Sequence, residues 1–138
     1  MNYLLDTNVI SETAKNSPHQ SVLNFLNTTP LERLYLSALT IGELSQGIVR
    51  APESRRDKLL RWFEGVKQRF SKRTLPLDAQ TLELWGRILG EARLKGEPLP
   101  PLDAMLAATA LKHDLILVTR NTKHFQNLPL LLLNPWTE

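Results

Sequence analysis

The sequence predicts an α/β domain with a mainly parallel central sheet of about four to five strands and helices on both faces. Short apolar runs at residues 3–5, 34–38 and 115–118 suit buried parallel strands. Segments with apolar residues at helical spacing alternate with these runs, which is the order expected of a parallel sheet. We expect residues 1–138 to form a single domain, because 138 residues can bury one real core.

The first strand is predicted at Tyr3–Leu5 and ends on Asp6, where the chain turns into a short helix. A second short helix is predicted over residues 18–26, and a second strand over residues 34–38. Thr40 is predicted to cap the next helix, with Glu43 three residues later completing a capping box. That helix should end at Ala51-Pro52.

The clearest helical pattern covers residues 53–70, with apolar side chains on one face. A small edge strand is predicted at residues 74–77, because Pro76 cannot donate to a strand ladder. Asp78 should cap a helix that ends at Gly96. Pro101 suits the first turn of an alanine-rich helix over residues 102–113. A strand at 115–118, a helical turn through residue 125 and a strand at 130–133 complete the prediction.

Composition narrows the classes of function. The chain has 42% hydrophobic and 22% charged residues, a formal charge of +3 and a pI of about 9.4, which permits a polyanionic partner without requiring one. It contains no cysteine, which excludes disulfides and thiolate zinc sites and fits a cytoplasmic protein. Asp6 interrupts any signal peptide, and no apolar run approaches the roughly 20 residues of a membrane span.

Polar residues stand at four junctions between predicted elements: Asp6, Glu43, Asp103 and Asn121. Asp6, Glu43 and Asn121 should share the carboxyl edge of the sheet, where open α/β sheets bind ligands. Asp103 joins them only if its helix begins at that edge. Each residue taken singly also fits a helix cap or a turn. If they converge, their hard oxygen donors suit Mg²⁺ or Mn²⁺ and phosphodiester chemistry.

Four segments resemble the motifs of the PIN domain, and more narrowly of the VapC- and FitB-type toxins of bacterial toxin–antitoxin pairs. The resemblance covers nearly the whole chain, and its residues are Leu4-Leu5-Asp6-Thr7-Asn8, Thr40-Ile41-Gly42-Glu43-Leu44, Pro101-Leu102-Asp103-Ala104 with Ala107-Ala108-Thr109-Ala110, and Val118-Thr119-Arg120-Asn121. It implies a Mg²⁺-dependent endoribonuclease, with Mn²⁺ as a possible substitute, that hydrolyses RNA phosphodiester bonds and inhibits translation. It also implies a homodimer and a cognate antitoxin.

The same resemblance implies roles for individual residues. Asp6 and Asp103 would be the principal metal ligands and Glu43 a further acidic ligand; with Asn121 these form the predicted catalytic set. The predicted substrate-binding residues are Asn8, Thr119, Arg120 and Lys123. The chain departs from the family pattern at His124, where an aspartate or glutamate is expected, so a second metal would bind weakly or only with RNA. His124 is interpreted as a solvated residue in preference to a proton-transfer group.

Three other functions remain open. One is a housekeeping PIN ribonuclease that processes RNA. Another is a non-catalytic RNA- or protein-binding PIN module, which the acidic residues disfavour and His124 mildly favours. The third is a phosphatase or receiver domain, which is disfavoured because no second aspartate lies near Asp6 and no lysine ends a later core strand.

Overall fold

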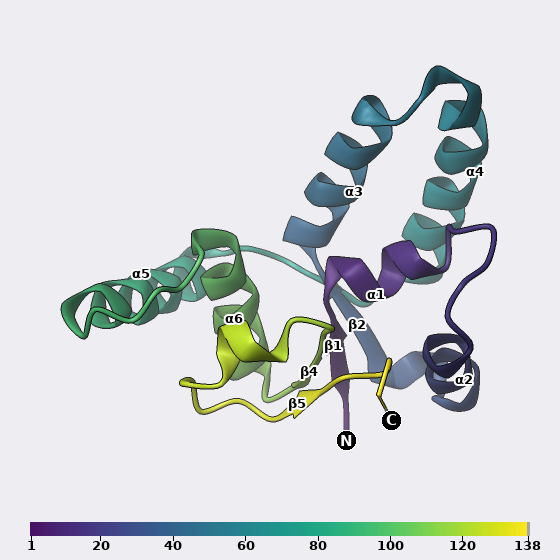
Figure 1. The fold of residues 1–138 in the computed structure, drawn as a ribbon. Coiled ribbons are helices and arrows are strands. Elements are labelled where there is room, and N and C mark those ends of the chain that lie inside the picture. The colour runs from purple at the N-terminus through teal and green to yellow at the C-terminus, as the bar shows by residue number, and fades with distance from the viewer. Residues whose placement is uncertain (138) are drawn as a thin grey trace.

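The structure, a computed structural model, describes residues 1–137 and contains the predicted sheet. Five parallel strands lie in the order β3-β2-β1-β4-β5 (Figure 1). β1 is therefore central, as a strand that carries a site residue at its carboxyl end should be. The strands are β1 (Tyr3–Leu5), β2 (Leu34–Ser37), β3 (Thr74–Leu75), β4 (Ile116–Val118) and β5 (Leu132–Leu133).

Helices cover both faces of the sheet, which confirms the predicted fold class. α3 and α4 pack side by side and project away from the sheet, while α5 and α6 pack together on the other side (Figure 1). The helices are α1 (Thr7–Glu12), α2 (Gln20–Thr28), α3 (Ala38–Arg50), α4 (Glu53–Arg69), α5 (Ala79–Leu94) and α6 (Pro101–His113), with 3₁₀ turns η1 (Leu31–Arg33) and η2 (Thr122–Phe125). No helix of the described residues has the length and apolar character needed to cross a membrane.

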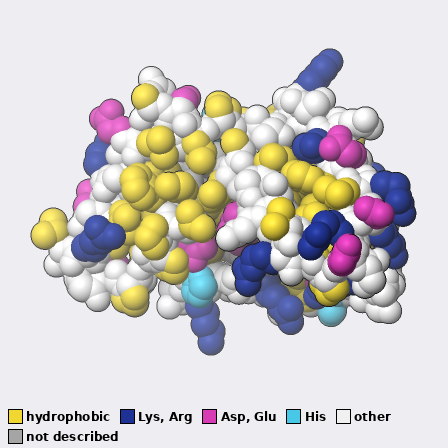
Figure 2. All heavy atoms as spheres, turned by 90° about the horizontal axis from the view of Figure 1, so that it is seen from above, with side chains coloured by type: hydrophobic (Ala, Val, Ile, Leu, Met, Phe, Trp, Pro, Cys, Tyr) yellow, Lys and Arg dark blue, Asp and Glu magenta, His cyan; other side chains and the backbone are white. Residues whose placement is uncertain are grey.

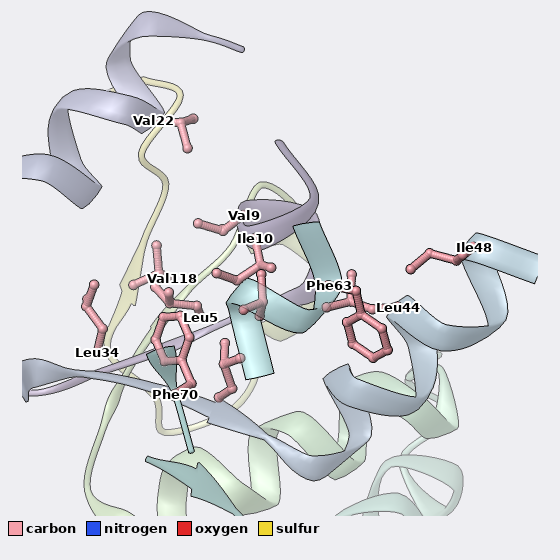
Figure 3. Close-up of a cluster of buried hydrophobic side chains, with 12 residues drawn as sticks. Leu5, Val9, Ile10, Val22, Leu34, Leu44, Ile48, Phe63, Phe70 and Val118 are labelled. Carbon is pink, nitrogen blue, oxygen red and sulfur yellow. The ribbon is translucent and has the colours of Figure 1, made fainter. Parts of the chain in front are cut away.

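Successive residues of β1 enter separate cores because side chains of a strand alternate between its two faces. Leu5 joins a cluster with Val9 and Ile10 of α1 and Phe63 of α4 (Figure 3). Leu4 joins a second cluster on the opposite face, which includes Leu106, Leu117 and Phe125. Each fully buried leucine or phenylalanine contributes about 1.5–3 kcal/mol. The two cores together hold the first turn of α1 rigidly above the end of β1.

The predicted capping box at Thr40 is wrong. Ser37 is the N-cap of α3, and its hydroxyl accepts a 3.1 Å hydrogen bond from the backbone N–H of Leu39. β2 thus turns into α3 without a loop, three residues earlier than the local pattern suggested. Thr40 lies inside the helix and is fully buried. The Glu43 side chain therefore does not cap the start of α3, and it accepts a hydrogen bond from Thr7 at the start of α1.

Other local predictions are confirmed. Asp78 caps α5 by accepting a 2.9 Å hydrogen bond from the backbone N–H of Thr81. Gly96 follows α5 with φ of +69°, a conformation that glycine adopts without steric cost. Pro101 is the first residue of α6, where its missing N–H leaves no hydrogen bond unmade. The predicted boundaries differ from the observed ones by a few residues, and α1 ends at Glu12.

Candidate functional site

Asp6 ends β1 and is the most buried carboxylate of the candidate site, with 8% of its surface exposed. Its backbone N–H donates to the carbonyl of Val118 at 2.9 Å, which ties it to the end of β4. Its Oδ1 accepts a 2.6 Å hydrogen bond from the N–H of Thr7. Its Oδ2 accepts from the Thr119 hydroxyl at 2.7 Å and from Asn8 Nδ2 at 3.4 Å. The carboxylate is thus oriented from two strands and one helix.

Glu43 reaches the same edge from the second turn of α3. The Thr7 hydroxyl donates a 2.6 Å hydrogen bond to Glu43 Oε1, and its oxygen also lies 3.1 Å from the hydroxyl oxygen of the buried Thr40. Thr7 therefore contacts Asp6 through its backbone and Glu43 through its side chain. Sequence reasoning assigned no role to Thr7 and gave Thr40 only the role of a helix cap, although both lie within the quoted motifs.

Asp103 lies in the first turn of α6, and its helix does begin at the edge of the sheet that carries Asp6. Asp103 Oδ2 lies 2.7 Å from Nδ1 of His124, which is in η2 immediately after β4. His124 keeps 46% of its side chain exposed. The interpretation of His124 as merely solvated was therefore incomplete, because its ring is held against a predicted metal ligand.

The charges of the other two carboxylates act on Asp6. Burial raises the pKa of Asp6 above its ordinary value, and the charges of Asp103 and Glu43 raise it further. Hydrogen bonds from Thr119 and Thr7 oppose this effect by stabilising the carboxylate. Such a cluster of buried or neighbouring negative charges is costly without a cation, so the site is arranged to attract one.

The fourth motif supplies backbone anchors as well as side chains. The Thr119 hydroxyl accepts a 3.0 Å hydrogen bond from the N–H of Asn121, and the N–H of Arg120 donates to Asn8 Oδ1 at 3.5 Å. Thr119 is fully buried, so its burial fits support of Asp6 and does not fit the predicted direct contact with substrate. Asn8 bridges Asp6 and Arg120. Asn121, Arg120 and Lys123 are exposed at the rim.

The side chains present fit a hard divalent cation held by few protein ligands. Each carboxylate keeps lone pairs beyond those used by the observed hydrogen bonds. Among residues 1–137, no group of three or more Asp, Glu, His or Cys side chains is spaced to enclose a metal. Mg²⁺ does not require such a cage, because it commonly binds one or two carboxylates and retains waters or substrate phosphates.

A cleft of about 370 Å³ opens beside the carboxylates, between α3 and α4. Thr7 and Glu43 form its polar end, and it continues along apolar side chains that include Leu44, Ile48, Leu59 and Trp62. Figure 2 shows acidic side chains beside a histidine in the lower centre of the view, with Lys and Arg side chains below and to the right of them. Glu43 thus lies both in the acidic site and at one end of this cleft.

Several characterised proteins are similar in sequence to this chain over almost its whole length. The VapC ribonuclease Y4jK of Sinorhizobium fredii is 35% identical, and the match covers 96% of each chain. The Toxin FitB of Neisseria gonorrhoeae is 34% identical and covers 96% of this chain and 97% of its own. The tRNA(fMet)-specific endonuclease VapC of Salmonella typhimurium is 32% identical, covering 99% of this chain and 98% of its own.

Solved structures resemble the fold as well. The FitAcB crystal structure from Neisseria gonorrhoeae matches with a TM-score of 0.92 and 33% identity, covering 99% of each chain. The structure of FitAB bound to an IR36 DNA fragment matches with a TM-score of 0.88 and 32% identity, covering 97% of this chain and 95% of that one. The family description "PIN domain" matches residues 3–130. The chain therefore belongs to the PIN domain family.

Proposed function

We propose that the protein is a metal-dependent endoribonuclease and the toxin of a toxin–antitoxin pair. The observation that carries the proposal is the hydrogen bonding of Thr7 to both Asp6 and Glu43, with the charge of Asp103 from the first turn of α6 also acting on Asp6. The names of the related proteins, which include a VapC ribonuclease and a tRNA(fMet)-specific endonuclease, support RNA as the substrate. Cleavage of RNA would inhibit translation.

Asp6 and Asp103 would hold the metal, with Glu43 as the further acidic ligand. Mg²⁺ is proposed and Mn²⁺ is its closest substitute, because both prefer oxygen donors. The bound ion would activate a water and stabilise negative charge on the phosphate. Thr119 and Thr7 fix the orientation of the Asp6 carboxylate, and Thr7 also fixes Glu43.

The remaining residues of the site would position the RNA. His124 holds Oδ2 of Asp103 at 2.7 Å and thereby limits how this carboxylate can turn. Asn121, Arg120 and Lys123 are exposed beside the carboxylates and offer donors to phosphate oxygens. The Asn8 side chain already donates to Asp6 and accepts from the backbone N–H of Arg120, so its proposed role is to support these two residues.

An antitoxin is the proposed protein partner. Its support is the set of similar structures, which include FitAB and VapBC complexes, some of them with DNA. In this chain the cleft between α1, α3 and α4 has Glu43 and Thr7 at one end, and its remaining lining is apolar side chains together with Ser11, Lys15 and Arg55. An amphipathic segment with a cationic end would fill this cleft and cover the carboxylates. A homodimer and a cytoplasmic location complete the proposal.

The test is cleavage of a structured RNA pool by the purified protein with Mg²⁺, with Mn²⁺ and with excess EDTA. Asp6→Asn is the matched variant, because it keeps the side-chain shape and removes the charge. Cleavage that requires both metal and Asp6 supports the nuclease. RNA binding without cleavage under either metal would support the non-catalytic module, and activity unaffected by a co-purified antitoxin would favour a housekeeping ribonuclease.

Toxicity needs a separate experiment in cells. Inducible expression in a bacterial host should stop growth and protein synthesis for the wild-type chain and leave both intact for Asp6→Asn. Co-expression of the protein encoded next to this chain should restore growth. Sedimentation of the purified chain reports whether it forms the proposed homodimer.

A further inference from the structure

The C-terminal segment brings Trp136 against Arg120 at the rim of the acidic site. The guanidinium carbon of Arg120 lies 5.1 Å from the centroid of the Trp136 ring, within the range of a cation–π contact. The two residues are sixteen positions apart, and neither the spacing nor the composition of the sequence indicates the contact. Nothing in the proposed reaction so far uses Trp136.

The backbone around Arg120 is held on both sides. The N–H of Thr119 donates to the carbonyl of Leu133 at 2.9 Å, which joins this segment to the C-terminal strand. The N–H of Arg120 donates to Asn8 Oδ1, and Asn8 in turn donates to Asp6. The position of the Arg120 backbone is thus linked to the central carboxylate through one side chain.

Trp136 is itself positioned by local contacts and by the core. Its backbone N–H donates to the Oδ1 of Asn134 at 2.9 Å, and its ring packs against the hydrophobic cluster that contains Leu5 and Val118. Pro135 beside it is buried. The position of the indole ring is therefore fixed. The Arg120 guanidinium that lies over it loses conformational freedom before any ligand binds.

The contact with the Trp136 ring leaves the N–H donors of Arg120 available. An arginine uses the face of its planar group on an aromatic ring, while its five N–H donors point outward in the plane. Among residues 1–137 no hydrogen bond or ion pair of the Arg120 side chain is found, although it lies in the electrostatic field of Glu12. By contrast, Arg56 and Arg73 donate to backbone carbonyls and serve the fold.

We propose that Arg120, held over the ring of Trp136, binds an RNA phosphate next to the one that is cleaved. Trp136 is its positioning residue, because it orients the guanidinium before RNA binds. This inference rests on the proposed ribonuclease function. A planar guanidinium can hold two phosphate oxygens at once, and the exposed face of the site carries Lys123 as a second cation. Arg120 would set where the RNA strand enters relative to Asp6.

Binding is measured with a fluorescent single-stranded RNA and the full chain in the Asp6→Asn background, over a series of salt concentrations. Arg120→Gln should weaken affinity by roughly 3- to 10-fold and reduce the slope of log affinity against log salt by about 0.7. Arg120→Lys should keep the salt slope but lose affinity, because lysine lacks the planar fork. Lys95→Gln is the matched control, since it removes one charge at the far end of α5.

Trp136 is tested by a pair of variants. Trp136→Phe keeps an aromatic face and should retain RNA affinity. Trp136→Leu should reduce RNA affinity by most of the factor expected for Arg120→Gln. In the wild-type background the Arg120→Gln and Trp136→Leu chains should show a raised KM with kcat nearly unchanged. Thermal melting identifies any variant that fails to fold, and Arg120→Gln alters an exposed side chain, so it remains informative if Trp136→Leu unfolds.

The outcomes separate the inference from the function on which it rests. If the wild-type chain cleaves RNA, and Arg120→Gln changes affinity and salt slope no more than Lys95→Gln, the phosphate role is overturned and the ribonuclease stands. If Arg120→Gln weakens only antitoxin binding, Arg120 belongs to the protein interface and the inference is likewise overturned. If the wild-type chain neither binds nor cleaves RNA, both proposals fail together.

Discussion

The Thr119 hydroxyl donates a 2.7 Å hydrogen bond to Oδ2 of Asp6, and this bond joins residues 113 positions apart. Both residues are almost fully buried. The bond opposes the effect of burial on the Asp6 carboxylate, because it stabilises the charged form. Thr119 therefore favours the ionised form of Asp6, which is the form that the proposed metal site requires.

Thr119→Val should destabilise the fold and weaken metal binding. The substitution removes the shorter of the two hydrogen bonds to Oδ2 of Asp6 and leaves only the 3.4 Å bond from Asn8, which costs about 1–3 kcal/mol. Chemical denaturation measures the loss, and titration with Mg²⁺ or Mn²⁺ measures the affinity. Thr119→Ser keeps the hydroxyl and should stay close to wild type. A Thr119→Val chain with unchanged stability and metal affinity would show that the bond has no such role.

Asp6→Asn should raise the thermal stability of the metal-free protein while it abolishes the proposed cleavage. Asparagine has the shape of aspartate, and its neutral side chain avoids both the cost of burial and the repulsion from Asp103 and Glu43. We expect the free energy of unfolding of the metal-free chain to rise by about 1 kcal/mol, because residues placed for function often reduce stability. Calorimetry without metal measures it.

The effect of added metal is the control for that prediction. Mg²⁺ should raise the melting temperature of the wild-type chain, because the ion binds the folded state, and should raise that of Asp6→Asn much less. An equal shift in both proteins would mean that the ion binds elsewhere.

His124→Ala should reduce the proposed metal affinity by roughly tenfold, because Asp103 loses the ring that restrains it at 2.7 Å. His124→Asp places a second carboxylate against Asp103, so it should lower the stability of the metal-free chain and make stability depend strongly on added Mg²⁺ or Mn²⁺. Melting curves with and without metal distinguish the two variants. Identical behaviour of wild type and His124→Ala in both assays would remove His124 from the site.

Glu12 gives a prediction about pH. Its pKa is lowered from 4.5, first by the hydrogen bond from Lys15 and also by the N–H of His19 and the charge of Arg120. A lowered folded-state pKa means that Glu12 stabilises the fold above its unfolded pKa, and that this contribution is lost as pH falls through the folded value. Glu12→Gln should therefore melt at a lower temperature than wild type near neutral pH.

The difference between Glu12→Gln and wild type should shrink as the pH falls below about 4. Melting curves across this range measure it. Glu32→Gln, on an exposed carboxylate in η1, is the control and should change little at any pH. If the difference in melting temperature between Glu12→Gln and wild type is the same at every pH, the packing of Glu12 stabilises the fold and its charge does not.

The sequence alone determined the features that depend on neighbouring residues. The apolar run before Asp6, the cap at Asp78, the positive φ at Gly96 and the proline that begins α6 are all local, because each follows from side-chain chemistry within a few positions. The class of fold follows from the order of these local elements. Thr40 shows the limit of local reasoning, since Ser37 was an equally good cap three residues earlier.

Only the tertiary structure decided which distant side chains touch. The strand order places β1 between β2 and β4, and this brings Thr119 to Asp6. The contacts of His124 with Asp103 and of Trp136 with Arg120 depend on how α6, η2 and the C-terminal segment pack against that sheet. Such contacts leave no periodic signal in the sequence, because their geometry is set by the packing of whole elements and not by residue spacing.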